Sequence, residues 1–193
     1  MGASLDGIKA VFLDLDGTIY LGGNLIPGAL EFLHRCDEQG VQRFFLSNNS
    51  SRSVTQYVKK LEGMGIPATA DDVLLSTHDC LAWLKKNNVT KTYCVGTEGM
   101  CKMLEAEGIS TRSLKPQYVV LGYDTETTYE KLETASLHLH AGVPLMASHP
   151  DMVCPSPDGG LPDVGAFLAL FKATTGVEPV HISGKPNAGM ILH

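Results

Sequence analysis

Residues 10–18 read A-V-F-L-D-L-D-G-T, a short apolar run that ends in two acids and a turn. The β-branched and aromatic side chains before Asp14 are typical of a buried strand. Side chains two apart in a strand face the same way, so Asp14 and Asp16 are expected to converge at its carboxyl end. Ligands bind at this end of the strands in open α/β sheets. Gly17 allows a tight turn directly after the pair.

Electrostatic repulsion between Asp14 and Asp16 leads to a second expectation. Two carboxylates this close repel each other, and a shared proton or an intervening cation removes the repulsion. Mg²⁺ prefers a few carboxylate oxygens together with water and phosphate oxygens. Acid pairs in turns are often merely solvated, but here the preceding strand is strongly apolar and favours a built site.

Polar side chains follow two further predicted strands. Residues 41–46 run into Ser47-Asn48-Asn49, whose hydroxyl and backbone N–H groups can cradle an oxyanion. Ser51 or Ser53 is the expected N-cap of the next helix, and Ser47 lies too early for that role. Ser183-Gly184-Lys185-Pro186 follows a last short strand, where a lysine can reach a phosphate and a carboxylate together. A lone lysine in a turn is usually solvated, so this segment gains meaning only beside the other two.

Strand and helix patterns alternate along the whole chain, which predicts an α/β fold with a parallel sheet and right-handed crossovers. The predicted strands are 10–14, 41–46, 92–95, 118–121, 145–147 and 181–182, and the predicted helices are 29–39, 53–64, 79–86, 98–107, 129–140 and 165–174. Residues 155–162, rich in Pro and Gly, are the expected long surface loop.

Composition excludes several other classes of protein. The 193 residues carry a net charge of -6, without the basic stripe of a nucleic-acid binder. No apolar run approaches the roughly 20 residues of a membrane helix, and the N-terminus lacks the layout of a signal peptide. A cytoplasmic location is therefore expected. The five cysteines show no C-x-x-C spacing and the seven histidines are scattered, so we interpret both as structural.

The three polar segments, in this order, resemble the haloacid dehalogenase superfamily of phosphatases. D-L-D-G-T is similar to its first motif, L-S-N-N to its second and G-K-P to its third. The longer stretches D-L-D-G-T-I-Y-L-G-G, N-N-S-S-R-S and G-K-P-N resemble the branch of NagD-like sugar and nitrophenyl phosphatases. The resemblance implies a Rossmann-like parallel-sheet core with an inserted α/β cap domain.

The spacing of the motifs fits this organisation, because Ser47 and Lys185 lie 138 positions apart (185 − 47). We expect residues 1–77 to form the first part of the core, 78–177 the cap, and 178–193 an incomplete return to the core. The family has a fourth, acidic motif that completes its Mg²⁺ site, and no such pair follows Lys185. We therefore expect a truncated chain that exposes an apolar sheet face, binds Mg²⁺ poorly and turns over slowly.

The resemblance also implies a mechanism for hydrolysing the phosphate ester of a small metabolite. Asp14 would attack phosphorus, and Asp16 would protonate the leaving alcohol and then activate water. Asp14 and Asp16 would hold Mg²⁺, and Lys185 would neutralise charge. The substrate-binding residues that the resemblance implies are Gly17, Thr18, Ser47, Asn48, Asn49, His149 and Asp151. No nucleic acid or membrane partner is expected, and a homo-oligomer through the cap stays open.

Two other readings remain at this point. A signalling receiver domain also places acids and a lysine at strand ends, but it has no room for a hundred-residue insert. A non-catalytic phosphate-binding protein on the same fold is the second, because fold does not fix function.

Overall fold

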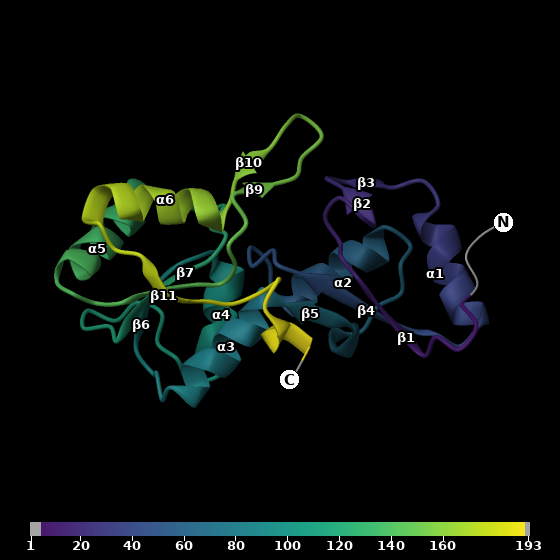
Figure 1. The fold of residues 1–193 in the computed structure, drawn as a ribbon, viewed down its shortest axis with the longest axis horizontal. Coiled ribbons are helices and arrows are strands. Elements are labelled where there is room, and N and C mark those ends of the chain that lie inside the picture. The colour runs from purple at the N-terminus through teal and green to yellow at the C-terminus, as the bar shows by residue number, and fades with distance from the viewer. Residues whose placement is uncertain (1–4, 192–193) are drawn as a thin grey trace.

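The computed structural model describes residues 5–191. Strands and short helical segments alternate through two sheets and two small hairpins (Figure 1). In chain order the elements are β1 (Ala10–Leu13), β2 (Tyr20–Leu21), β3 (Asn24–Leu25), α1 (Ala29–Glu38), β4 (Gln42–Ser47), α2 (Val54–Gly63), η1 (Ala70–Asp72), β5 (Val73–Leu75), α3 (Ser76–Lys86), β6 (Thr92–Val95), α4 (Glu98–Ala106), β7 (Tyr118–Leu121), α5 (Tyr129–His140), β8 (Leu145–Ala147), β9 (Val153–Cys154), β10 (Leu161–Pro162), α6 (Val164–Thr175), β11 (Pro179–Ile182) and η2 (Ala188–Ile191).

The first sheet is parallel, in the order β1-β4-β5. Helices α1 and α2 bury Leu33 and Leu61 against Phe45 of β4, which forms one hydrophobic core. On the sheet, Phe12 stacks on Phe44 with ring centroids 5.2 Å apart. Phe12 remains 51% exposed on this sheet.

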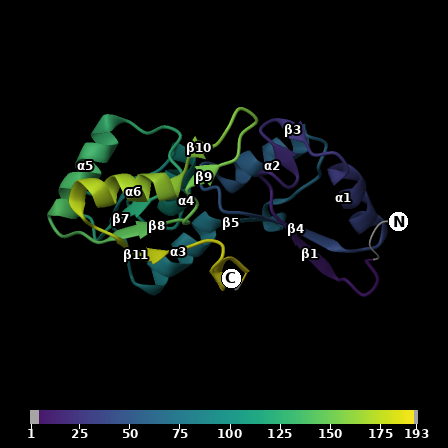
Figure 2. The same ribbon diagram turned by 45° about the horizontal axis from the view of Figure 1, so that its top comes forward.

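The second sheet is also parallel, in the order β11-β8-β7-β6. Successive residues of β7 alternate between two cores: Val119 and Leu121 belong to the core formed with α5 and α6, and Val120 belongs to the core formed with α3 and α4. Figure 2 shows α5 and α6 over one face and α3 beneath the other. Helices on both faces explain why the strands are apolar throughout rather than alternating.

Most predicted elements are present with closely similar bounds, and β6, β7, α5 and β8 match the prediction at both ends. Strand β5 and the two hairpins were not predicted, and β10 lies inside the expected loop 155–162. The last described element is η2, and residues 192–193 lie outside the described part of the chain.

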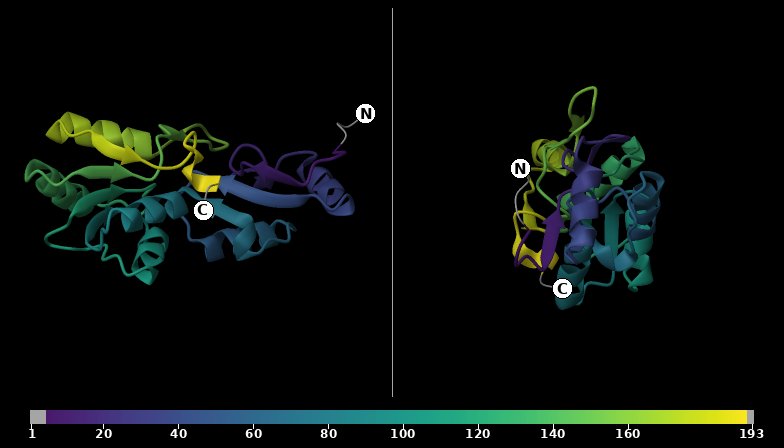
Figure 3. Two further views of the ribbon diagram at one scale, coloured as in Figure 1. Left: turned by 60° about the horizontal axis from the view of Figure 1, so that its bottom comes forward. Right: turned by 90° about the vertical axis from the view of Figure 1, so that its right-hand side faces the viewer.

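The end of the second sheet differs from the expected boundary. Strand β11 pairs with β8, so residues 179–182 belong to the second sheet and not to the first. The chain then crosses back, and η2 contacts both β5 and α3. Figure 3 shows this last segment between the two sheets. The crossing is fixed by the Gly184 N–H, which donates to Asp79 Oδ2 at 2.8 Å.

Within residues 5–191, no helix combines the length and the apolar character needed to cross a bilayer.

Candidate active site

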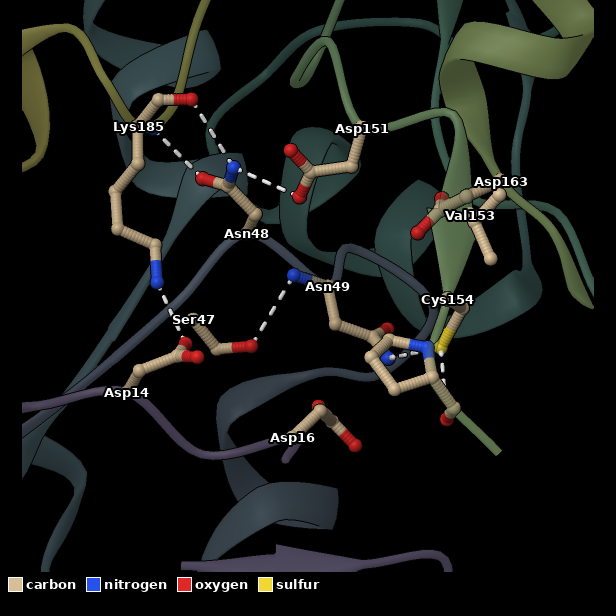
Figure 4. A pocket seen from close by; sticks show the side chains of 11 residues that line it. Asp14, Asp16, Ser47, Asn48, Asn49, Asp151, Val153, Cys154, Asp163 and Lys185 are labelled. Carbon is tan, nitrogen blue, oxygen red and sulfur yellow. Dashed lines mark hydrogen bonds and ion pairs between the residues drawn. The ribbon is translucent and has the colours of Figure 1, made fainter. Parts of the chain in front are cut away.

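The carboxyl ends of β1 and β4 meet the segment after β11 around one cavity of about 170 Å³ (Figure 4). Parallel strands end at the same edge of their sheet, which is why residues far apart in sequence converge here. The lining residues are Asp14, Asp16, Ser47, Asn48, Asn49, Asp151, Val153, Cys154, Pro155, Asp163 and Lys185.

Asp14 and Lys185 form the closest ion pair of the cavity lining. The Lys185 ammonium donates to Asp14 Oδ1 at 2.5 Å and to the Leu46 carbonyl oxygen at 3.1 Å. The two side chains are 44% and 32% exposed, so the pair faces the cavity and remains accessible. The lysine is thereby held beside the first carboxylate with its charge partly open to a ligand.

Asp16 lies deeper than Asp14. Gly17 has φ +87°, and its N–H donates to the Tyr20 carbonyl oxygen at 2.7 Å, which closes the turn predicted after the acid pair. Burial raises the pKa of the Asp16 carboxyl above its ordinary 3.8, although Lys60, 3.9 Å from Oδ1, opposes the rise. Asp16 Oδ2 is buried and has no hydrogen-bond partner among the described residues. A carboxyl that tends to keep its proton suits a general acid.

The Asn48 side chain joins three parts of the site. Its Oδ1 accepts from the Lys185 N–H at 2.7 Å, and its Nδ2 donates to the Lys185 carbonyl oxygen at 3.1 Å. Nδ2 also donates to Asp151 Oδ2 at 2.9 Å. Gly184 has φ +77°, and a Cβ there would lie 2.7 Å from Asn48 Oδ1, so this close approach requires glycine.

Ser47 and Asn49 form the turn that follows β4. Ser47 Oγ accepts from the Asn49 N–H at 3.1 Å, and Asn49 Oδ1 accepts from the Ser51 N–H at 3.0 Å. The N-cap of α2 is Ser53, one of the two serines expected there, and it forms a capping box with Gln56. The Ser47 hydroxyl thus faces the cavity while another serine caps the helix.

The opposite wall, called the roof below, consists of Asp151, the β9–β10 hairpin and Asp163. Asp163 is the N-cap of α6, and its Oδ1 accepts from the Val164 N–H at 2.7 Å. Burial raises the pKa of Asp163 to about 7. Behind the roof, His149 is fully buried, and burial lowers its pKa to about 4. Its imidazole is therefore neutral near pH 7.

The structure brings seven of the sequence-predicted residues into the cavity lining: Asp14, Asp16, Ser47, Asn48, Asn49, Asp151 and Lys185. Gly17, Thr18 and His149, which were predicted to bind substrate, are not in that lining. Thr18 is exposed, and His149 is buried behind the roof.

Sequence reasoning missed four lining residues: Val153, Cys154, Pro155 and Asp163. Asp163 lies two residues before the helix predicted at 165–174, and an Asp near a helix start is an N-cap signal that could have singled it out. No comparable signal marks Cys154, because only the tertiary placement of the hairpin brings it to the cavity.

Comparison with known proteins gives consistent results. Residues 11–110 match the family model described as haloacid dehalogenase-like hydrolase. The acid sugar phosphatase of Staphylococcus saprophyticus is 36% identical over 180 residues, which cover 92% of this chain and 69% of that protein.

Solved structures agree with the sequence match. The crystal structure of a 4-nitrophenylphosphatase from Thermotoga maritima has a TM-score of 0.89 and 39% identity, with 97% of this chain and 72% of the other covered. A glycerol phosphate phosphatase from Mycobacterium tuberculosis, in complex with magnesium, has a TM-score of 0.86 and 28% identity, with 95% of this chain and 56% of the other covered. The chain therefore belongs to the haloacid dehalogenase-like hydrolases, within their NagD-like branch.

Proposed function

We propose that this protein hydrolyses small phosphate monoesters, such as sugar phosphates or nitrophenyl phosphate, with Asp14 as the nucleophile. The observation that carries the proposal is the Lys185–Asp14 contact of 2.5 Å in a cavity that also holds Asp16 and the end of β4. The names of the relatives support the substrate class, since they are phosphatases of sugar, nitrophenyl and glycerol phosphates.

In the first step, an Asp14 oxygen forms a bond to phosphorus and the ester P–O bond breaks, which leaves an aspartyl phosphate. Each unit of repulsion between a carboxylate and a phosphate at ~4 Å costs about 4 kcal/mol at an effective dielectric near 20. Lys185 lies where its charge offsets part of this repulsion. The Ser47 hydroxyl and the Asn48 N–H hold phosphate oxygens in the same proposal.

Asp16 supplies and recovers the proton. Its raised pKa favours the protonated carboxyl, which gives its proton to the departing alcohol oxygen. The resulting carboxylate then takes a proton from the water that attacks the aspartyl phosphate, and inorganic phosphate leaves. The partnerless Oδ2 atom leaves Asp16 free to exchange this proton.

The donor atoms around Asp14 and Asp16 fit Mg²⁺. Asp14 and Asp16 line the cavity together, and the Asp14 side chain is 44% exposed, so its carboxylate oxygens are open to a cation. Oxygen-only donors are what Mg²⁺ prefers, and the Asp14 carboxylate and the Asp16 carbonyl oxygen would hold it. When bound, Mg²⁺ supplies positive charge that neutralises the phosphoryl oxygens.

The domain division is part of the same proposal. We assign residues 1–77 to the core and 78–177 to a cap, and the pairing of β11 extends the cap sheet to Ile182. The roof comes from this unit, so the size and polarity of the alcohol group would be selected there. Asp151 is the predicted substrate-binding residue of the cap that lines the cavity.

Hydrolysis of 4-nitrophenyl phosphate by the purified protein, with and without Mg²⁺, tests the proposal. We expect Mg²⁺-dependent release of nitrophenol that Asp14→Asn reduces to less than a few per cent. Asp71→Asn, at an exposed position of η1 outside the cavity lining, is the matched control and should retain full activity. Retained turnover in Asp14→Asn would show that the nucleophile is a different residue.

A further inference from the structure

We infer that His149, Asp151 and Asp163 form a binding site for one divalent transition-metal cation in the roof of the cavity. Each of the three residues offers one ligand atom, and these atoms all lie within 4.8 Å of one another. His149 Nδ1 lies 3.5 Å from Asp151 Oδ2, and His149 Nε2 lies 3.5 Å from Asp163 Oδ1. This cluster is separate from the Asp14–Asp16 pair.

The histidine is the observation that distinguishes this cluster from a chance grouping of acids. His149 is 0% exposed, and neither ring nitrogen has a hydrogen-bond partner within residues 5–191. Buried polar atoms are nearly always satisfied, so an imidazole with two unsatisfied nitrogens needs an explanation. A cation bound to one nitrogen supplies a partner for that nitrogen, and the other nitrogen faces a carboxylate oxygen 3.5 Å away.

The spacing of the donors suits a small cation. Zinc-type ions bind histidine nitrogen and carboxylate oxygen at about 2.0–2.2 Å. Ligands at that radius lie roughly 3 to 4 Å from one another, and the 3.5 Å contact between the ligating nitrogen and its neighbouring carboxylate falls in this range, while the other carboxylate lies within 4.8 Å. A small closing movement of the carboxylate farther from the ligating nitrogen completes the set.

The donor types select the class of cation. Mg²⁺ and Ca²⁺ prefer oxygen donors alone, whereas imidazole together with carboxylate suits Zn²⁺, Mn²⁺ or Co²⁺. The charge of the cavity favours a cation as well, because Asp14, Asp16, Asp151 and Asp163 face it against the single lysine of its lining, Lys185.

The position of the site suggests what the cation does. Asp151 precedes the β9–β10 hairpin, and Asp163 follows it at the start of α6. Both carboxylates retain other contacts, since Asp151 Oδ2 accepts from Asn48 and Asp163 Oδ1 accepts from the Val164 N–H. A cation between them ties together the two ends of the hairpin and fixes the roof over the cavity.

A Co²⁺ titration of metal-depleted protein, followed by visible absorption and calorimetry, tests this inference. The Asp14→Asn background weakens the oxygen site, so the remaining tight binding reports on the roof. We expect one equivalent of Co²⁺ to bind, and we expect His149→Phe or Asp163→Asn to raise the Kd by about 100-fold. Asp158→Asn, in the same hairpin but exposed, should leave the Kd unchanged.

Asp163→Asn guards against misfolding, because its amide oxygen can still cap α6. A urea unfolding curve identifies the variants that are folded, and only the Co²⁺ Kd values of those variants are compared. Two results would overturn the inference: the absence of saturable Co²⁺ binding in Asp14→Asn, or binding that Asp163→Asn leaves unchanged. In either case His149 would be held by a proton shared with its carboxylate neighbours and not by a metal.

Discussion

Replacing Lys185 with Met removes one positive charge beside Asp14 and keeps an unbranched side chain. The ammonium contacts Asp14 Oδ1 at 2.5 Å, so a phosphoryl group bound at Asp14 would lie about 4 Å from it. At that distance and an effective dielectric near 20, the attraction is about 4 kcal/mol. Both side chains are more than 30% exposed, so solvent screening reduces the attraction to about 3 kcal/mol. Since each 1.36 kcal/mol is tenfold in rate, kcat/KM should fall by about 100-fold.

The assay is the initial rate of 4-nitrophenyl phosphate hydrolysis at saturating Mg²⁺, with thermal unfolding measured on the same samples. Lys172→Met is the matched control, because Lys172 forms an exposed pair with Glu178 away from the cavity lining. A folded Lys185→Met protein within fivefold of the wild-type kcat/KM would refute this role of the lysine charge.

Three further substitutions test other features of the molecule. Asp16→Asn should slow the hydrolysis of an alkyl phosphate by about 10²–10⁴-fold. It should slow the hydrolysis of 4-nitrophenyl phosphate much less, because nitrophenolate leaves without a proton. Equal losses of rate on the two substrates would contradict general acid catalysis by Asp16. Gly184→Ala should lower the free energy of unfolding by about 1–3 kcal/mol in a urea titration, since φ is +77° and the new Cβ would meet Asn48 Oδ1. Burial lowers the pKa of His181 below its ordinary 6.5, so protonation of this side chain favours the unfolded chain. When the pH falls from 7.5 to 5, the wild type should therefore lose more stability than the His181→Gln variant loses. Parallel melting curves for the two proteins at the two pH values would exclude that explanation.

Local patterns account for the part of the fold that the sequence predicts. The strand at 118–121 and the helix at 129–140 are long enough, and bounded clearly enough, for their periodicity to define both ends. Strand β5 has three residues and follows two acids, and β2, β3, β9 and β10 have two residues each. Strands of two residues carry no usable periodicity, because their pairing partners hold them in place.

The residues of the site also include some whose placement the sequence predicts and some whose placement it does not predict. Asp14, Ser47 and Lys185 follow strands, and the geometry of parallel sheets brings such strand ends together, so their convergence was predictable. The position of His149 was not, because a residue in a loop can face a ligand or turn into the interior. Packing of the roof decides between these, and it buries His149 completely.

The Asn48 amide has a consequence for the timing of substrate entry and product escape. Two of its hydrogen bonds grip the backbone of Lys185, and a third reaches Asp151 in the roof. Lifting the roof breaks only the third of these bonds, which joins an amide to a carboxylate and contributes about 1.5–3 kcal/mol. Lys185 would keep its position beside Asp14 while the roof is open. Phosphate could then leave and a new ester could enter without separating the Lys185–Asp14 pair.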